Sequence, residues 1–219
     1  MPDLQPPTRP VFPRPPPPPK FSFDADPSLA EWQTSARTWL TTHDKSWNGL
    51  AGSCLVFNPA GRVLLLQRAA HDSMPNLYEV PGGGVDDADP TVLHGAAREL
   101  WEEAGLVARR FARVVTEGPT RAPGYVFANR TGKRFYCRFS FEVEVVDVGT
   151  VTIDLNEHQR FVWASEAEVR AQKMGDLPIP MTNAEMRNLL LEGFRLRREA
   201  GLKTSEEGGD DQDGPSTVL

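Results

Sequence analysis

The sequence contains no apolar run long enough to cross a bilayer. Its longest aliphatic stretch is only four residues, Val63-Leu64-Leu65-Leu66, whereas a membrane-spanning helix needs about 20 apolar residues. No apolar stretch of signal-peptide length stands near the first residue. We therefore expect an intracellular protein, located in the cytoplasm.

Cysteine is scarce, and the histidines are scattered. Cys54 and Cys137 are the two cysteines, and each lies in a strand-like run. Such a pair is more typical of buried free thiols in a reducing compartment than of a disulfide or a metal site. His71, His94 and His158 lack the spacing of metal ligands, so metal binding by cysteine or histidine is not expected.

An excess of positive charge is also missing. The 219 residues include 24 Lys and Arg against 30 Asp and Glu, which gives a net charge of −6. This balance argues against non-specific binding to nucleic acid or to anionic membranes. The modest basic group Arg130, Lys133, Arg134 and Arg138 is expected to lie on a solvated hairpin. A small nucleotide that arrives with a metal ion remains compatible with the charge.

Both ends of the chain have the composition of tails. Residues 1–27 are proline-rich and are expected to be extended or disordered. Pro15, Pro18 and Lys20 match a PxxPx+ pattern, so a weak SH3-type contact is an alternative to a solvated tail. The acidic stretch 203–219 is expected to be disordered. One domain is left, residues 28–202.

Hydrophobic periodicity divides this domain into helices and short strands. Helical spacing begins after Asp26-Pro27, and a second helix, to about residue 200, follows a capping box of Thr182 and Glu185. Strands are expected at 52–57 and 62–67, paired as a hairpin, and at 77–80, 114–117, 134–146 and 160–164. Strands and helices alternate without regular βαβ units. This order predicts an α/β fold in which a mixed sheet carries helices on both faces.

The most informative segment is the helix expected from Asp89-Pro90, as cap and first residue, to Ala104. Glu99, Glu102 and Glu103 share one face of this helix. The three carboxylates repel one another and lie near the negative end of the helix dipole. Both effects destabilise the fold, so we infer that something positive binds there.

A hard divalent cation is the ligand that three carboxylates favour. The preceding Pro81-Gly82-Gly83-Gly84 offers an unobstructed backbone, and Arg98 stands four residues before Glu102, where it can hold that carboxylate. The expected chemistry is attack of water on a phosphoanhydride bond. The alternative is a solvated acidic helix end.

The segment Arg98-Glu99-Leu100-Trp101-Glu102-Glu103-Ala104-Gly105-Leu106 resembles the box of the Nudix hydrolases, G-x5-E-x7-R-E-U-x-E-E-x-G-U, where U is aliphatic. Tyr78-Glu79-Val80-Pro81-Gly82-Gly83 is similar to the family's W-E-x-P-G-G strand end. The resemblance covers about residues 50–165, although only the box is specific, and it implies an α/β/α sandwich. It also implies Mg²⁺ or Mn²⁺ held by Glu99, Glu102, Glu103 and the Gly82 carbonyl, with Arg98 orienting a glutamate.

The first acidic position of the box departs from the family pattern. Counted from Gly84 or from Arg98, that position is occupied by Pro90. Aligned on Pro81-Gly82-Gly83, it is occupied by Asp89, with one extra loop residue before Arg98. We favour the second alignment because a longer loop costs little and an acid is kept.

The remaining site residues are less certain from sequence. Asn156-Glu157-His158 resembles the family's late E-H segment, so Glu157 is the candidate second acid, as metal ligand or general base; a loop glutamate exposed to water is the alternative. Arg68 can contact a phosphate or end its strand. Tyr78 and Phe135 can stack on a base or pack in the core.

The resemblance implies a pyrophosphohydrolase that acts on a small molecule containing a diphosphate linkage. Two rivals stay open: a non-catalytic nucleotide-binding or regulatory module, and an isomerase of the same fold that acts on isoprenoid diphosphates. The isomerase would need an additional cysteine or glutamate base, for which no segment is evident. Specificity is expected in the loops 68–77, 117–133 and 146–159.

Overall fold

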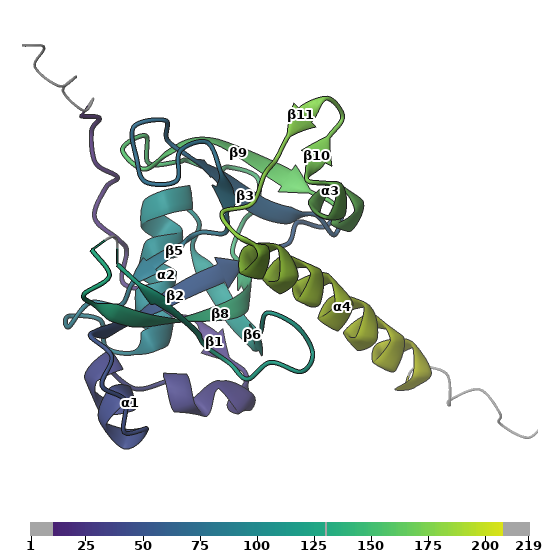
Figure 1. The fold of residues 1–219 in the computed structure, drawn as a ribbon. Coiled ribbons are helices and arrows are strands. Elements are labelled where there is room, and N and C mark those ends of the chain that lie inside the picture. Colours follow the sequence, from purple (N-terminus) through teal and green to yellow (C-terminus); the bar gives the residue numbers. More distant parts are fainter. Residues whose placement is uncertain (1–10, 130, 208–219) are drawn as a thin grey trace, which may run out of the picture.

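The computed structural model describes residues 11–129 and 131–207 as a mixed sheet flanked by helices, with a second small sheet beside it (Figure 1). The helices are the 3₁₀ helix η1 (Pro27–Trp32), α1 (Ala36–Thr42), α2 (Val92–Ala104), α3 (Glu166–Ala171) and α4 (Ala184–Glu207). The strands are β1 (Asp24–Ala25), β2 (Gly49–Leu55), β3 (Val63–Arg68), β4 (Tyr78–Glu79), β5 (Gly82–Gly84), β6 (Ala108–Val115), β7 (Tyr125–Ala128), β8 (Phe135–Val145), β9 (His158–Ala164), β10 (Lys173–Met174) and β11 (Leu177–Pro178).

The larger sheet has the strand order β1-β6-β8-β2-β5, and β7 also pairs with β8. The pairs β2–β8 and β1–β6 are parallel, whereas β2–β5, β6–β8 and β7–β8 are antiparallel. A second, three-stranded sheet has the order β4-β3-β9 and is antiparallel, and β10 and β11 form a separate antiparallel pair. The mixed α/β architecture expected from the order of elements is therefore confirmed.

Two hydrophobic clusters hold the layers together. Helix α2 packs with η1 and α1 on one face of the larger sheet, around the buried Cys54, Phe139 and Phe141. Helix α4 packs around Leu55 and strand β3 in the second cluster. The approach of α2 to the sheet is close, since a Cβ atom on Gly52 would stand 2.7 Å from the Cβ of Ala96. The glycine in β2 thus sets how near the helix lies to the sheet.

The N-terminal helix is interrupted rather than continuous. Asp26 caps η1 as predicted, because its side chain accepts a hydrogen bond of 3.0 Å from the backbone N–H of Ser28. The chain then leaves the helical conformation, and Ser35 caps α1 by accepting from the N–H of Thr38 at 3.2 Å. A second capping serine within the periodic stretch therefore starts a new helix.

The predicted hairpin of 52–57 and 62–67 forms only at its turn. The N–H of Asn58 donates to the carbonyl of Arg62, and Phe57 forms a single bridge with Val63. Beyond the turn β2 pairs with β5 and β8, while β3 pairs with β4 and β9. The two strands separate into different sheets because each completes its hydrogen bonds with other partners.

Two further element bounds differ from the predictions. Strand β6 begins at Ala108, earlier than the expected 114–117. The early part was not recognised because Arg109, Arg110 and Arg113 interrupt its apolar pattern; in the structure these arginines pair with glutamates. The N–H of Met186, in α4, donates to the side chain of Asn183 at 2.7 Å, so the cap is not Thr182. Helix α4 continues past residue 200 to Glu207.

The folded unit begins before residue 28. Strand β1 pairs with β6, and Phe23 packs 4.8 Å from the ring of Phe111, so residues 21–27 belong to the core rather than to a tail. Residues 1–10 and most of the predicted acidic tail, 208–219, lie outside the described residues. Within the described part of the chain, no helix is both long enough and apolar enough to cross a membrane.

Candidate functional site

The start of α2 differs from the prediction by two residues. Thr91 is the N-cap, and its hydroxyl accepts a hydrogen bond of 3.2 Å from the N–H of His94. Asp89 cannot serve as the cap because its carboxylate is already bound by Arg98 and by the N–H of Asp86. The helix ends as predicted at Gly105, which has a φ of +67° and is the natural left-handed C-terminal residue.

Arg98 connects the glycine turn with the carboxylates of Asp86, Asp89, Glu99 and Glu102. Its guanidinium contacts Asp89 at 3.0 Å, Glu99 at 2.8 Å and Glu102 at 2.9 Å. It also donates to the carbonyl oxygen of Gly84 at 2.6 Å. The predicted pair of Arg98 and Glu102 is therefore confirmed. Arg98 also binds Asp89, and this contact supports the alignment that places Asp89 at the first acidic position of the box.

Glu103 is the most buried acid of the helix, with 5% of its surface exposed. One of its carboxylate oxygens accepts a hydrogen bond of 2.7 Å from the N–H of Gly82. Glu103 forms no ion pair with a basic side chain among the described residues. Burial, and then the nearby carboxylates of Glu79 and Glu99, raise the pKa of Glu103 well above its usual range. A buried carboxylate in this setting is a strong attractor of cations.

Glu99 lies against the backbone of β5. A Cβ atom on Gly83 would stand 2.6 Å from the carboxylate of Glu99, so a larger residue there would displace this carboxylate from its present position. Burial raises the pKa of Glu99 to about 7, although Arg98 opposes the effect. Repulsion from Glu102 and Glu157 adds to the increase. The glycine turn and the helix together thus place a carboxylate that protonates readily when no cation is bound.

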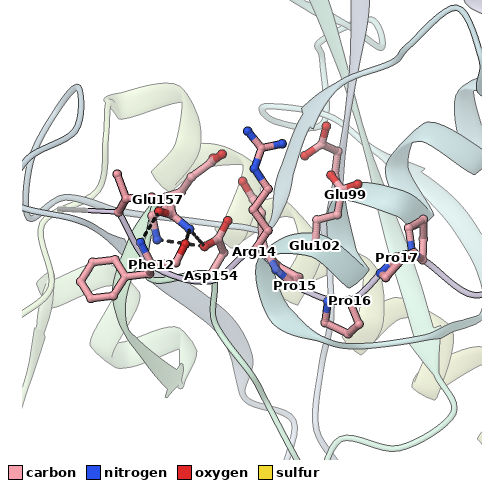
Figure 2. Close-up of a pocket in the computed structure, with 13 residues that line it drawn as sticks. Phe12, Arg14, Pro15, Pro16, Pro17, Glu99, Glu102, Asp154 and Glu157 are labelled. Atoms are coloured by element: carbon pink, nitrogen blue, oxygen red, sulfur yellow. Dashed lines mark hydrogen bonds between the residues drawn. The ribbon is translucent and has the colours of Figure 1, made fainter. Parts of the chain in front are cut away.

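The three glutamates line one cavity of about 500 Å³ together with a late loop and the proline-rich segment (Figure 2). The loop contributes Asp154, Asn156 and Glu157 to the wall facing α2. Glu157 is exposed, as the alternative of a loop glutamate in water predicted, but it lines the same cavity as the helix glutamates. Asp154 was not anticipated. Gly82 does not line this cavity. Its N–H donates to Glu103, and this hydrogen bond joins the start of β5 to the helix.

The carboxylate oxygens that line the cavity are of the kind that a hard divalent cation binds, but they do not point toward one common position. Among the described residues, no group of three or more acidic, histidine or cysteine side chains is arranged to hold a metal ion. Arg98 draws Glu99 and Glu102 toward itself, and Gly82 holds Glu103. A cation must therefore compete with these contacts. Small rotations of side chains that line the same cavity would supply the oxygen ligands that Mg²⁺ or Mn²⁺ requires.

Arg68 is fully engaged by protein groups. Its guanidinium pairs with Glu79 and, at 2.6 Å, with Asp72, and it donates to the carbonyl of Ser73 at 2.6 Å. These contacts favour the alternative in which Arg68 organises the end of its strand. Glu79, which the sequence did not single out, also lies 3.4 Å from the buried ring of His158 and contributes to the raised pKa of Glu103.

The prediction that Tyr78 stacks on a substrate base is wrong. Its side chain is 0% exposed and belongs to the second hydrophobic cluster. A two-residue strand has too little periodicity to show which side faces inward. The alternating pattern predicted that Phe135 packs in the core. Phe135 is instead 49% exposed, at the first position of β8.

A second cavity, of about 560 Å³, lies beside the glycine turn, and we call it the sheet trough. Its lining residues are Ala51, Arg68, Met74, Glu79, Gly82, Gly83, Gly84, Tyr125, Phe127, Ala128, Tyr136, Arg138, Thr182 and Asn183. The register explains its shape, because Arg138 stands opposite Ala51 on one side and Tyr125 on the other, and Ala51 stands opposite Gly84. Small residues on β2 and β5 therefore face large ones on β7 and β8.

Three aromatic rings form a wall of the sheet trough. The ring centroids of Tyr125 and Phe127 are 6.3 Å apart, and those of Phe127 and Tyr136 are 5.8 Å apart, with interplanar angles of 13° and 27°. This aromatic wall was not predicted from the sequence. The available signal was the alternation along 134–146, which places Tyr136 and Arg138 on the face opposite Cys137 and Phe139.

The predicted hairpin is formed by β7 and β8, and Lys133 and Arg134 are exposed on it as expected. Arg138, however, is half-buried beside these rings rather than solvated. Its guanidinium lies 5.3 Å from the ring centre of Tyr125. Within the described structure, its Nε and Nη2 atoms are buried and have no hydrogen-bond partner. Burial lowers the pKa of Arg138, although Glu117 and Glu79 oppose the effect. A guanidinium in this state favours an anionic or hydrogen-bond-accepting ligand.

A NUDIX domain family model matches residues 47–184, which is more than half of the chain. The chain belongs to the Nudix family. It is 42% identical over 55 residues to an RNA pyrophosphohydrolase of Psychrobacter sp. (strain PRwf-1), covering 25% of this chain and 29% of that protein. It is 35% identical over 60 residues to an RNA pyrophosphohydrolase of Rhizobium meliloti (strain 1021), covering 27% and 34%. The chain thus spans about a third of the length of these curated relatives.

The fold is that of solved Nudix-family structures. The MutT protein from Methanosarcina mazei Go1 superposes with a TM-score of 0.50 at 24% identity, and the match covers 68% of this chain and 94% of that one. This likeness concerns the fold and confirms the Nudix-type α/β arrangement expected from the box.

Proposed function

We propose that this Nudix protein is a metal-dependent pyrophosphohydrolase, which cleaves a phosphoanhydride bond by attack of water. One observation carries the proposal: Glu99, Glu102 and Glu103 line a single cavity, in which the buried Glu103 contacts only a backbone N–H within the described residues. This arrangement destabilises the protein without a cation. The cost is offset when a divalent ion neutralises the carboxylates.

The proposed roles follow from the positions of the side chains. Glu99, Glu102 and Glu103, with the carbonyl oxygen of Gly82, would hold Mg²⁺ or Mn²⁺. When bound, the ion would polarise phosphate oxygens and acidify water. Arg98 keeps two of these carboxylates in position through contacts of 2.8 and 2.9 Å. The carboxylate of Glu157, on the loop wall of the same cavity, would accept a proton from the attacking water.

We assign the non-phosphate part of the substrate to the sheet trough. The rings of Tyr125, Phe127 and Tyr136 suit a flat base, and Arg138 suits an anionic or accepting group. Gly82 and Gly83 separate the sheet trough from the glutamates, so a base in the sheet trough can carry its phosphates across the glycine turn. This placement favours nucleoside polyphosphates and nucleoside-diphosphate conjugates over isoprenoid diphosphates.

The experiment is a substrate panel with Mg²⁺ or Mn²⁺, analysed by identifying the products so that the cleaved bond is located. Nucleoside triphosphates, nucleotide sugars and dinucleotides belong in it, and RNA with a 5′-triphosphate is included because the two curated relatives are RNA pyrophosphohydrolases. We expect metal-dependent release of phosphate-containing products from at least one class. Tight binding without turnover across the panel would instead indicate a non-catalytic nucleotide-binding module.

A further inference from the structure

The proline-rich residues 11–18, here called the N-terminal strap, form one wall of the glutamate cavity. Val11, Phe12, Arg14 and Pro15 to Pro18 line it opposite α2 and the loop of Asp154 (Figure 2). In Figure 1 this segment, coloured purple, runs beside α2 before the chain enters β1. A stretch with the composition of a solvated tail is therefore part of the site.

The N-terminal strap is fixed on both sides of Arg14. On one side, the N–H of Phe12 donates to the side-chain oxygen of Asn156 at 2.9 Å, and the amide of Asn156 donates back to the carbonyl of Phe12 at 3.2 Å. On the other side, the indole N–H of Trp101 donates to the carbonyl of Pro16 at 3.1 Å. Asp154 in turn holds the amide of Asn156 at 2.8 Å.

The prolines make this anchoring effective. Pro13 and Pro15 flank Arg14 directly, and each proline ring restricts its backbone to one extended region. Because the segment is stiff and anchored at both ends, Arg14 between the anchors loses little conformational entropy when a ligand binds. Figure 2 shows the side chain of Arg14 projecting between Glu99 and Glu102 on one side and Asp154 and Glu157 on the other.

Arg14 lies among acids, yet it forms no ion pair with any carboxylate in the described part of the chain. Two arginines near the glycine turn, Arg98 and Arg68, behave differently, since each pairs with more than one carboxylate. An arginine that plugged the cavity would pair with the glutamates. Arg14 instead stays exposed above them, where its charge is available to an anion that enters with a cation.

We propose that Arg14 is a substrate-binding residue, which the N-terminal strap holds over the glutamate cavity to bind a phosphate group of a diphosphate-containing ligand. The inference rests on the proposed function, because it needs a metal-bound diphosphate in that cavity. Guanidinium groups bind phosphate oxygens through two parallel charge-assisted hydrogen bonds, which lysine cannot reproduce.

The test uses the full-length chain and measures binding of inorganic pyrophosphate in the presence of Mg²⁺ by calorimetry. The variant Arg14→Gln is compared with Lys20→Gln, which removes the same charge from the same proline-rich region at an exposed position that does not line the cavity. We expect Arg14→Gln to weaken pyrophosphate binding about tenfold or more, as loss of a charge-assisted hydrogen bond predicts. Arg14→Lys should recover part of the affinity, and Lys20→Gln should match the wild type.

Because the readout is binding and not product formation, the result separates this inference from the hydrolase proposal. Loss of pyrophosphate affinity in Arg14→Gln supports the role of Arg14 even if no substrate in the panel is cleaved. Unchanged affinity in Arg14→Gln overturns it, as does a wild-type protein that binds no pyrophosphate with Mg²⁺. Tighter binding or faster turnover in Arg14→Gln would also overturn it, since the side chain would then be an obstruction.

Discussion

Arg98 and Asp89 form an ion pair of 3.0 Å that ties the middle of α2 to the loop before it. Asp89 is buried, and it also accepts a hydrogen bond of 2.8 Å from the N–H of Asp86. The aspartate thus orients the arginine, which in turn holds Glu99 and Glu102. This contact supports the alignment that places Asp89 at the first acidic position of the box.

Asp89→Asn should lower the free energy of unfolding by roughly 1–3 kcal/mol, because it weakens a buried charged network while keeping the shape of the side chain. Asp87→Asn is the matched control, since Asp87 is 85% exposed and its pair with Arg37 spans 3.4 Å at the surface. Denaturant unfolding of both variants measures the difference. Equal stabilities would show that the pair of Asp89 and Arg98 contributes nothing to the fold.

Glu103→Gln should stabilise the metal-free protein by about 1 kcal/mol, because it removes a buried negative charge and leaves an oxygen that can still accept from Gly82. Glu102→Gln should have a smaller effect, since Glu102 is more exposed and pairs with Arg98. Thermal unfolding in the presence of a chelator provides the measurement. A lower stability for Glu103→Gln than for the wild type would contradict the description of Glu103 as a strained carboxylate.

The stability of the metal-free protein should fall as pH rises from about 4.5 to about 7. The pKa of Glu99 is raised from 4.5 to about 7, so over that interval the folded chain retains a proton that the unfolded chain releases. The contribution of Glu99 is complete below pH 4.5 and is lost as pH passes 7. Unfolding measured at several pH values should show a shallower decline for Glu99→Gln; a decline identical to the wild type would argue against a raised pKa.

Arg138→Leu should weaken substrate binding while leaving the ligand-free protein as stable as the wild type, or slightly more stable. Two buried nitrogens of Arg138 lack partners within the described residues, so removing the charge relieves a desolvation cost. Arg134→Leu, at an exposed position just before β8, is the control. Steady-state kinetics on the best substrate of the panel should show a raised KM for Arg138→Leu only. An unchanged KM would remove Arg138 from the substrate site.

The glutamate cluster could be predicted from sequence because its geometry is local. Glu99, Glu102 and Glu103 share a helix face through their spacing alone, and the glycine turn lies only a few residues upstream. The partner of Arg98 was less certain, since the loop around Pro90 allowed two alignments. The structure favours Asp89 through a contact between residues nine positions apart.

The sheet trough could not be predicted because it depends on register between distant strands. Arg138 meets Ala51 across β8 and β2, and no local pattern indicates that pairing. The choice between core packing and base stacking for Tyr78 could not be made from sequence for a related reason, since its orientation is set by β3 and by the second hydrophobic cluster. The N-terminal strap is the extreme case, because Phe12 and Asn156 are 144 residues apart in the chain.

The most direct test of the central claim is the rate of product formation on the best panel substrate, measured for the wild type and for Glu103→Gln with Mg²⁺ and with a chelator. The proposed role of the glutamate cavity predicts turnover by the wild type only when metal is present, and a rate at least about 100-fold lower for Glu103→Gln, as expected when a metal ligand is lost. Full activity of Glu103→Gln, or wild-type turnover that persists in the chelator, would contradict it.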